Sequence, residues 1–281
     1  MFKKFFLIAL FFAGYNFAGA QTINDEAKEQ MQICDCPQQS KAGKGTFYFS
    51  GGYNLDWFSR STIHFKSGPN AENNYDFKLH KLRAIDRDGL DELFTSDITI
   101  PQYSFRLGYF FNDKHDLGIE INYDHVKYVV VQNQKAHLTG IINEKAYDQD
   151  TVLTPGFVMF EHTNGANYAM INFMKRNNMY KSANKKHWLG YVVKAGFGFV
   201  YPRSDTKIMG SRRNDIYHVA GYVGGIESGI RYDAFKYFFF ETTLKGAYAK
   251  YVNVRLEGDG RGTHGFFSLE YIALLGFQFT L

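Results

Sequence analysis

The sequence predicts an all-β fold, namely a transmembrane antiparallel up-and-down β-barrel of about ten strands with a filled polar lumen. Three observations predict it: the periodicity of the last eighteen residues, an export signal at the N-terminus, and a composition that is rich in aromatic residues yet polar on average. A spanning strand has lipid on one face and a polar lumen on the other, so its sequence alternates with a period of two.

The final segment, 264–281, shows this alternation most clearly. Apolar or aromatic side chains occupy one face from Phe267 to Phe279, and the opposite face carries small or polar residues such as Ser268 and Glu270. Bacterial outer-membrane barrels commonly close on an aromatic-rich C-terminal strand. This tail resembles that signal, although its last residue is leucine rather than phenylalanine.

The N-terminus has the pattern of an export signal. Lys3 and Lys4 precede an apolar run over 5–13, and small residues occupy the −3 and −1 positions of a cleavage site after Ala20. The pattern predicts a signal peptide over 1–20. The apolar run is too short for a spanning helix, which needs ~20 residues.

The mature chain is expected to start with a polar periplasmic lead-in over 21–44 and to continue as an outer-membrane barrel over 45–281. An exported chain with no helical anchor is either soluble or a barrel, because a closed barrel leaves no backbone group unpaired in lipid. The composition favours the barrel: 28 Phe and 20 Tyr accompany a mean hydropathy of −0.33. The formal net charge of +4 is too small to indicate nucleic acid binding.

Ten segments are expected to form the strands. Seven alternate strongly: 46–57, 101–112, 117–131, 187–201, 219–232, 237–252 and 266–281. Three alternate weakly: 136–144, 152–161 and 167–175. The weak segments set the bounds of the count at eight and twelve strands.

The lengths of the connections agree with this count. An even number of strands places both termini on the periplasmic side. The turns at 112–116 and 233–236 are short and fall on that side, whereas the connections 58–100, 202–217 and 253–264 are longer and fall outside. Outer-membrane barrels have short periplasmic turns and longer extracellular loops.

Charged side chains are expected inside the barrel, because each alternates with an apolar face. They are Arg106, Glu120, Asp124, Lys194, Glu227, Arg231, Glu241, Lys245 and Glu270. A Lys or Arg facing lipid at the bilayer midplane would cost about 2–4 kcal/mol. A barrel of about eight strands is just wide enough for side chains to fill it. We therefore expect a packed core of ion pairs rather than a diffusion pore.

One segment, 160–168, concentrates hydrogen-bonding and titratable groups between apolar strands. Its polar members are Glu161, His162, Thr163, Asn164 and Asn167. Such a group can supply a general base, His162 or Glu161, and a nucleophile or polar support, Thr163. The alternative interpretation is a polar turn capped by Asn and Thr side chains.

The segment resembles the His-x-Ser-Asn-Ala motif of the outer-membrane lipid A deacylases, small barrels that hydrolyse an acyl ester of lipopolysaccharide. If Thr163-Asn164-Gly165 matches Ser-Asn-Ala, Glu161 stands in the place of the catalytic His. If His162 matches that His, Asn164 stands in the place of the Ser. The resemblance implies a catalytic site here.

A second polar cluster, which contains Asp124 and His125, could approach this segment. Basic residues in a predicted outside loop, Arg203, Arg212 and Arg213, are candidates for binding lipopolysaccharide phosphates, because guanidinium groups bind phosphate bidentately. Solvated charges are the alternative. The expected partners are outer-membrane lipids and lipopolysaccharide. A protein partner is left open, and nucleic acid is not expected.

No metal or cofactor is expected. Cys34 and Cys36 are predicted to form a local disulfide, since two thiols alone do not supply the four ligands of a zinc site. The nine His are scattered along the chain rather than spaced as metal ligands.

Three functions remain open for a chain that is similar to the outer-membrane barrels of Bacteroidota or other Gram-negative bacteria. The first is a non-enzymatic barrel whose outside loops bind lipopolysaccharide, a partner or a small ligand. The second is a lipid A acyl-ester hydrolase that uses the 161–167 segment. The third is a small selective channel.

Overall fold

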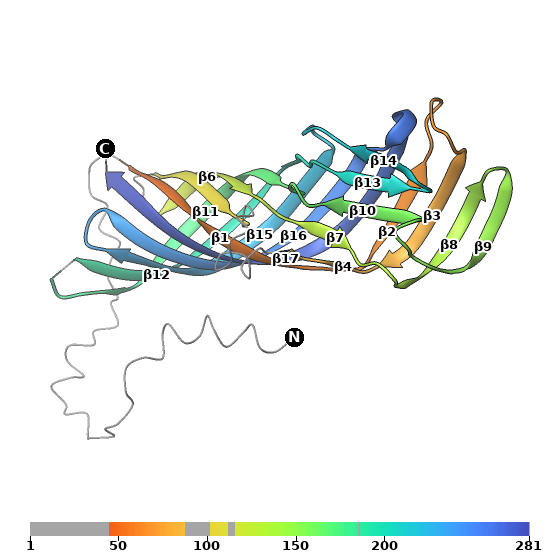
Figure 1. Cartoon of the computed structure of the whole chain (residues 1–281). Coiled ribbons are helices and arrows are strands. Elements are labelled where there is room, and N and C mark those ends of the chain that lie inside the picture. Colours follow the sequence, from red (N-terminus) through yellow and green to blue (C-terminus); the bar gives the residue numbers. More distant parts are fainter. Residues whose placement is uncertain (1–44, 88–101, 112–115, 185, 281) are drawn as a thin grey trace, which may run out of the picture. The chain divides into compact units, whose positions relative to one another are not determined.

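A closed ring of eight antiparallel strands forms the wall of a barrel (Figure 1). The ring runs in the order β1, β5, β6, β11, β12, β15, β16, β17, and β17 pairs again with β1 to close it. Its strands are β1 (Thr46–Phe58), β5 (Ser104–Phe110), β6 (Leu117–Asp124), β11 (Tyr168–Lys181), β12 (His187–Val200), β15 (Gly221–Ala234), β16 (Phe238–Arg255) and β17 (Arg261–Thr280).

The computed structural model describes residues 45–87, 102–111, 116–184 and 186–280, all within the unit Cys36–Leu281. The predicted signal peptide and lead-in, with Cys34 and Cys36, lie outside these residues, so those predictions stay untested. No helix in the described part of the chain is long and apolar enough to cross a membrane.

The outer face of the ring is apolar. Exposed aliphatic and aromatic side chains cover it, as a surface in contact with lipid requires. Examples from separate strands are Phe49, Ile121, Phe173, Phe197, Ile226, Leu244 and Leu275. The fold class predicted from the alternation is therefore confirmed, with eight strands in the ring rather than ten.

The two segments that do not join the ring belong to a group of extracellular strands that the sequence analysis did not predict. Segments 136–144 and 152–161 leave the ring and form strands on the side of the long connections. One reason is visible in β9 (Lys145–Val152), which lies between these segments and pairs with the first of them: Lys145, Asp148 and Asp150 put charge on both of its faces. A spanning strand must keep one face apolar.

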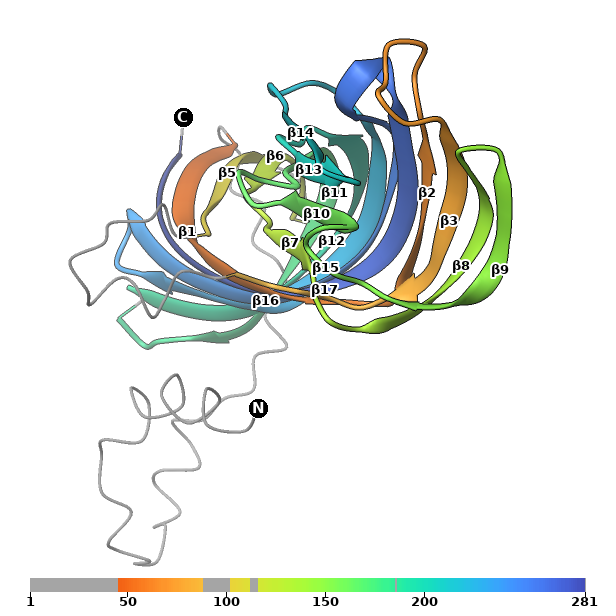
Figure 2. The same cartoon turned by 45° about the vertical axis from the view of Figure 1, so that its right-hand side comes forward.

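These strands build what we call the outer module, which consists of two sheets. The first extends the barrel wall from the start of β17 through β2 (Ser61–Lys66), β3 (Tyr75–Leu82), β8 (Lys135–Ile142) and β9. The second has five short strands: β14 (Ser211–Asn214), β13 (Asp205–Ile208), β10 (Val158–His162), β7 (Tyr128–Val130) and β4 (Ala84–Ile85). Figure 2 shows the second sheet within the curve of the first.

An apolar core fills the space between the two sheets and the adjoining ends of the ring strands. It includes Phe65, Phe77, Tyr128, Phe160 and Tyr251, all buried. Short turns join the ring strands at the end where β1 begins and β17 ends. That end is therefore periplasmic, and the outer module lies on the extracellular side.

Candidate functional site

The lumen of the ring is filled by side chains, and all nine charged residues predicted to face it are buried. Lys194 of β12 is at the centre of one group. Its Nζ lies 2.8 Å from Glu120 on β6, 2.7 Å from Glu241 on β16 and 3.2 Å from Glu227 on β15. A single ammonium thus contacts carboxylates from three strands and ties opposite sides of the wall together.

Asp124, one of the predicted binding residues, is the centre of a second group. Its carboxylate accepts hydrogen bonds from Arg106 at 2.5 Å, from Lys245 at 2.7 Å and from the Ser104 hydroxyl at 2.7 Å. These partners come from β5 and β16. Asp124 is therefore part of the packed lumen, and its contacts explain its burial without a ligand.

His162, the predicted general base, lies on β10 with its side chain in the apolar core. Its Nδ1 is 2.7 Å from Ser204 Oγ, its Nε2 is 3.0 Å from His264 Nε2, and its ring stacks on Tyr251. Burial lowers the pKa of His162 to about 3. The ring is neutral at physiological pH, and both of its nitrogens already have partners.

Glu161 and Thr163 face the opposite side of β10, because side chains alternate along a strand. The Thr163 hydroxyl donates to Glu161 at 3.1 Å, and Arg87 lies 3.6 Å from the same carboxylate. The structure therefore separates His162 from the other two members of the predicted catalytic group. It keeps Glu161, the alternative base, and Thr163, the candidate nucleophile, in hydrogen-bond contact.

His125 meets the other end of the segment. Its Nδ1 lies 2.8 Å from Asn167 Oδ1, and its ring stacks on Tyr103. Asn167 also donates to the Tyr201 carbonyl at 2.9 Å, while the Asn164 carbonyl accepts from a tyrosine hydroxyl. The expected approach of the two polar clusters occurs through His125 and Asn167, whose contacts fasten loops to the ring.

The three predicted phosphate-binding arginines have acceptors within the chain. Arg212 pairs with Asp205 across the β13–β14 hairpin, with Nε 2.9 Å from the carboxylate. Arg213 lies 3.2 Å from Asp215, and Arg203 Nε donates to the Asp215 carbonyl at 3.1 Å. Phosphate would have to compete with these contacts.

A row of cations that the sequence did not suggest crosses the outer, convex face of the extended sheet. Arg255 of β16 is directly opposite Arg261 of β17, and Arg261 is directly opposite Lys66 of β2. Lys250 lies further down β16 on the same face. We call these four residues the cation row. Within the described residues, Lys66 has one carboxylate partner, Asp76 at 3.5 Å, and no ion pair is found for the other three.

Like charges directly opposite one another on neighbouring strands are destabilising. Asp76 offers little relief, because it is already 2.6 Å from His64. The signal in the sequence was present: Arg255 and Arg261 flank a short turn, so that a hairpin would set them opposite each other. The region was instead predicted to be a loop, and the pairing was missed.

An apolar groove lies on the lipid-facing wall below the cation row. It has a volume of about 410 Å³ and is lined by residues of β15, β16 and β17, among them Gly224, Ile226, Gly246, Tyr248 and Phe267. A methyl group added at Gly246 would meet nothing within 4 Å. The groove exists because two outward positions have no side chain where their neighbours have large ones.

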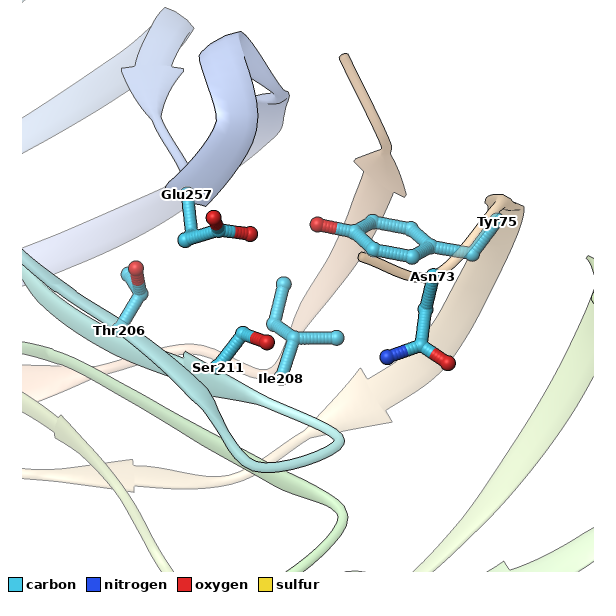
Figure 3. A pocket seen from close by; sticks show the side chains of 6 residues that line it. All are labelled: Asn73, Tyr75, Thr206, Ile208, Ser211 and Glu257. Atoms are coloured by element: carbon cyan, nitrogen blue, oxygen red, sulfur yellow. The ribbon is translucent and has the colours of Figure 1, made fainter. Parts of the chain in front are cut away.

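A polar recess opens at the far end of the outer module, between β3, the β13–β14 hairpin and η1 (Glu257–Asp259) (Figure 3). Tyr75 and Glu257 face each other across it. Burial, followed by the nearby Glu257 charge, raises the pKa of Tyr75 to about 12. The recess measures about 230 Å³ but has no room for a water-sized sphere, so it is a packed contact rather than a ligand pocket.

No group of three or more His, Cys, Asp or Glu in the described ranges is arranged to hold a metal ion. A closed ring, an apolar outer band and a lumen of paired charges are together the features of a barrel that spans the bacterial outer membrane. This protein is an outer-membrane β-barrel.

No family model and no curated protein matches the chain. Among solved structures it is similar to the outer membrane protein AlkL, at 12% identity and a TM-score of 0.33, covering 85% of this chain and 92% of AlkL. It is also similar to OprG of Pseudomonas aeruginosa, at 9% identity, a TM-score of 0.32 and coverage of 86% and 99%.

A further similar structure is Ail, the attachment invasion locus protein of Yersinia pestis, at 10% identity, a TM-score of 0.31 and coverage of 84% and 99%. Likeness at this level carries no argument about the function of this chain. None of these three names is that of a lipid A deacylase or points to the Bacteroidota, so both resemblances stay predictions.

Proposed function

We propose that this barrel is neither an enzyme nor a channel and that its outward surface binds lipopolysaccharide. One observation carries the proposal: charges inside the barrel are paired, whereas among the described residues no ion pair is found for Lys250, Arg255 and Arg261 of the cation row on the convex outer face. A protein that keeps cations opposite one another on three neighbouring strands is stabilised by an anion that bridges them. In the outer leaflet the abundant anions are lipopolysaccharide phosphates.

The filled lumen argues against a channel. Lys194, Arg106 and Lys245 cross the interior to carboxylates on other strands. The apolar core of the outer module covers the extracellular end of the same space. An ion passing through would have to break several buried pairs, each of which is costly to leave uncompensated.

The surroundings of His162 argue against the deacylase. A hydrolase acting on lipid A needs its base and nucleophile to reach an ester in the membrane. His162 is fully buried with both nitrogens engaged, and Thr163 faces the other side of the sheet. The Thr163 hydroxyl does contact Glu161, but that carboxylate also pairs with Arg87 at 3.6 Å. The geometry favours the non-enzymatic barrel over the deacylase.

The chemistry of the cation row favours phosphate over other anions. Two guanidinium groups side by side offer planar forks that match phosphate oxygens, and the lysines add point charges. The predicted loop arginines are weaker candidates, because Arg212 and Arg213 already have carboxylates within the chain.

The experiment compares lipids on the full-length mature protein in nanodiscs. We expect native mass spectrometry to find lipopolysaccharide retained on the barrel in preference to phosphatidylethanolamine, and we expect salt to weaken that retention, since exposed ion pairs are screened. Equal retention of the two lipids would refute the proposal.

Two further measurements test the alternatives. Stepwise conductance in planar bilayers would establish a channel, whereas we expect no conductance. A changed acyl pattern in lipid A from cells that express the protein would establish the deacylase. We expect an unchanged pattern, and the same pattern for the His162→Ala variant.

A further inference from the structure

The cation row and the apolar groove lie on the same strands and on the same face. Tyr248 and Phe267 form the upper wall of the groove, on β16 and β17. Lys250 is two residues further along β16, and Arg261 is six residues away on β17. At about 3.3 Å per residue, these steps place the charges about 7 to 20 Å beyond the groove along the strands.

The boundary of the hydrocarbon falls between the two features. On β16, Leu244 and Tyr248 point outward and Lys245 points into the lumen, as lipid on the outside requires. Beyond Tyr248 the same two faces exchange their chemistry: the outward face carries the charged Lys250, and the inward face carries Tyr251, which is buried in the outer module. Groove and cation row are thus an apolar site and a charged site on opposite sides of one boundary.

The aromatic and basic side chains at the boundary lie close to each other. A methyl group added at Gly265 would come within 2.8 Å of the Tyr248 hydroxyl and 3.1 Å of Lys250 Cδ. Both side chains therefore extend across Gly265 on the outer face. This arrangement makes a continuous path from the groove to the cation row.

We infer that the groove and the cation row form one site for the lipid A part of lipopolysaccharide, with an acyl chain in the groove and a phosphate on Arg255, Arg261 and Lys66. The inference rests on the proposed function and adds to it the place and the part of the molecule that is bound. Charge complementarity selects this occupant, because a second copy of the chain would set cation row against cation row.

A test uses two kinds of variant, and each removes one half of the site. Arg255→Gln with Arg261→Gln removes two charges. Gly246→Leu fills the groove, and the open space around Gly246 means that the new side chain meets no other group. Native mass spectrometry of each variant in nanodiscs, titrated with lipid A, measures the dissociation constant.

Matched controls make the same changes elsewhere. Lys186→Gln with Lys236→Gln removes two exposed charges from turns at the periplasmic end. Ala169→Leu adds a side chain to the lipid face of β11, away from the groove. We expect lipid A to bind about tenfold or more weakly to the double Arg variant, since hydrogen bonds between oppositely charged groups are the stronger kind. We expect a smaller loss for Gly246→Leu and none for the controls.

The outcomes separate the site from the function. If the wild-type protein binds lipid A and neither variant binds it more weakly, the proposed site is wrong and the proposed function still stands. Wild type that does not prefer lipid A to phosphatidylethanolamine would overturn both. If affinity for lipid A falls in the double Arg variant but not in Gly246→Leu, the groove is not the acyl site. A protein dimer that Gly246→Leu dissociates would show that a second copy, not lipid, occupies the groove.

A modified lipid tests the same two contacts by changing the ligand instead of the protein. Lipid A without its phosphates keeps the acyl chains and loses the groups proposed to contact the cation row. We expect it to bind wild type about as weakly as intact lipid A binds the double Arg variant. Undiminished binding of the dephosphorylated lipid would overturn the role given to Arg255 and Arg261.

Discussion

The interior of the ring and the interior of the outer module are two cores built from the same strands, with opposite chemistry. In the ring, β16 and β17 point Lys245 and Glu270 inward, and these form part of a buried charge network. In the outer module the same two strands contribute Tyr251 and Phe266 to an apolar core. The difference teaches that the medium outside the wall decides what goes inside it.

The reversal follows from the cost of each placement. Where lipid surrounds the wall, an outward charge is costly, so the polar residues face inward and pair. Where water surrounds the wall, burial of apolar surface is the driving force, at about 25 cal/mol per Å². A single strand can serve both parts because side chains alternate along it and its sequence changes which set is apolar.

The largest expected effect comes from breaking the charged core. Lys194→Met leaves Glu120, Glu227 and Glu241 together without their shared cation. We expect the free energy of unfolding to fall by about 3–5 kcal/mol, the cost of removing one partner of a buried ion pair. Urea titration of the protein in lipid vesicles measures it.

The exposed Lys186 supplies the control for this prediction. Lys186→Met makes the same chemical change in a periplasmic turn and should leave the free energy of unfolding within about 0.5 kcal/mol of wild type. Equal and small effects of the two substitutions would mean that the lumen charges are solvated, and the contrast between the two cores would fail.

The next effect sharpens the position of the boundary. Leu244→Lys puts a charge on the lipid face of β16 near the middle of the band and should cost about 2–4 kcal/mol, whereas Val252→Lys, on the same strand and face beyond the boundary, should cost about 0–1 kcal/mol. The same urea titration compares them. Similar costs at the two positions would remove the boundary from its place near Tyr248.

A third prediction is that the stability of the outer module depends on pH. Burial lowers the pKa of His162 to about 3, from an ordinary value near 6.5. Between these values the unfolded segment binds a proton that the folded one does not. Stability contributed by neutral His162 is therefore complete above about pH 6.5 and decreases as the pH falls toward 3.

At about pH 5 the expected loss is about 2 kcal/mol, at about 1.4 kcal/mol per pH unit. Hydrogen exchange should show faster exchange of the amides of β10 at that pH than at neutral pH, with little change at the centre of β12. In the His162→Phe variant the pH dependence should be smaller. A pH dependence as large as in wild type would assign it to other groups.

Much of the barrel could be predicted from the sequence, because lipid imposes a rule that each spanning strand must obey separately. The eight ring strands all correspond to predicted segments, and the nine lumen charges are all buried. The outer module does not follow that rule. Its strands are short, and some of their partners are distant in sequence, as where β3 pairs with β8, so period-two alternation alone placed segments 136–144 and 152–161 in the wall.

The candidate site was harder to predict for the same reason. The polar segment around His162 was found from the sequence. Which of its side chains meet depends on the face of β10 to which each one points, and on which of the two faces is covered by the core. The acceptors of Arg212 and Arg213 depend on a hairpin that was predicted as loop. In the cation row, Arg255 and Arg261 meet across a short hairpin, but the place of Lys66 depends on the register between β2 and β17, and no local pattern fixes a register across so much chain.

The smallest expected effect comes from an ion pair on the surface, and it completes the contrast with Lys194. Arg212 pairs with Asp205 across the β13–β14 hairpin as closely as Lys194 does with its carboxylates, but its side chain is 58% exposed. Asp205 is itself buried, but water solvates the exposed guanidinium and salt screens it, so the pair contributes little. Arg212→Gln should lower the free energy of unfolding by less than about 1 kcal/mol, and salt should reduce even that. A loss as large as that of Lys194→Met would show that geometry rather than burial sets the strength of ion pairs in this molecule, and the distinction between its two environments would no longer account for its stability.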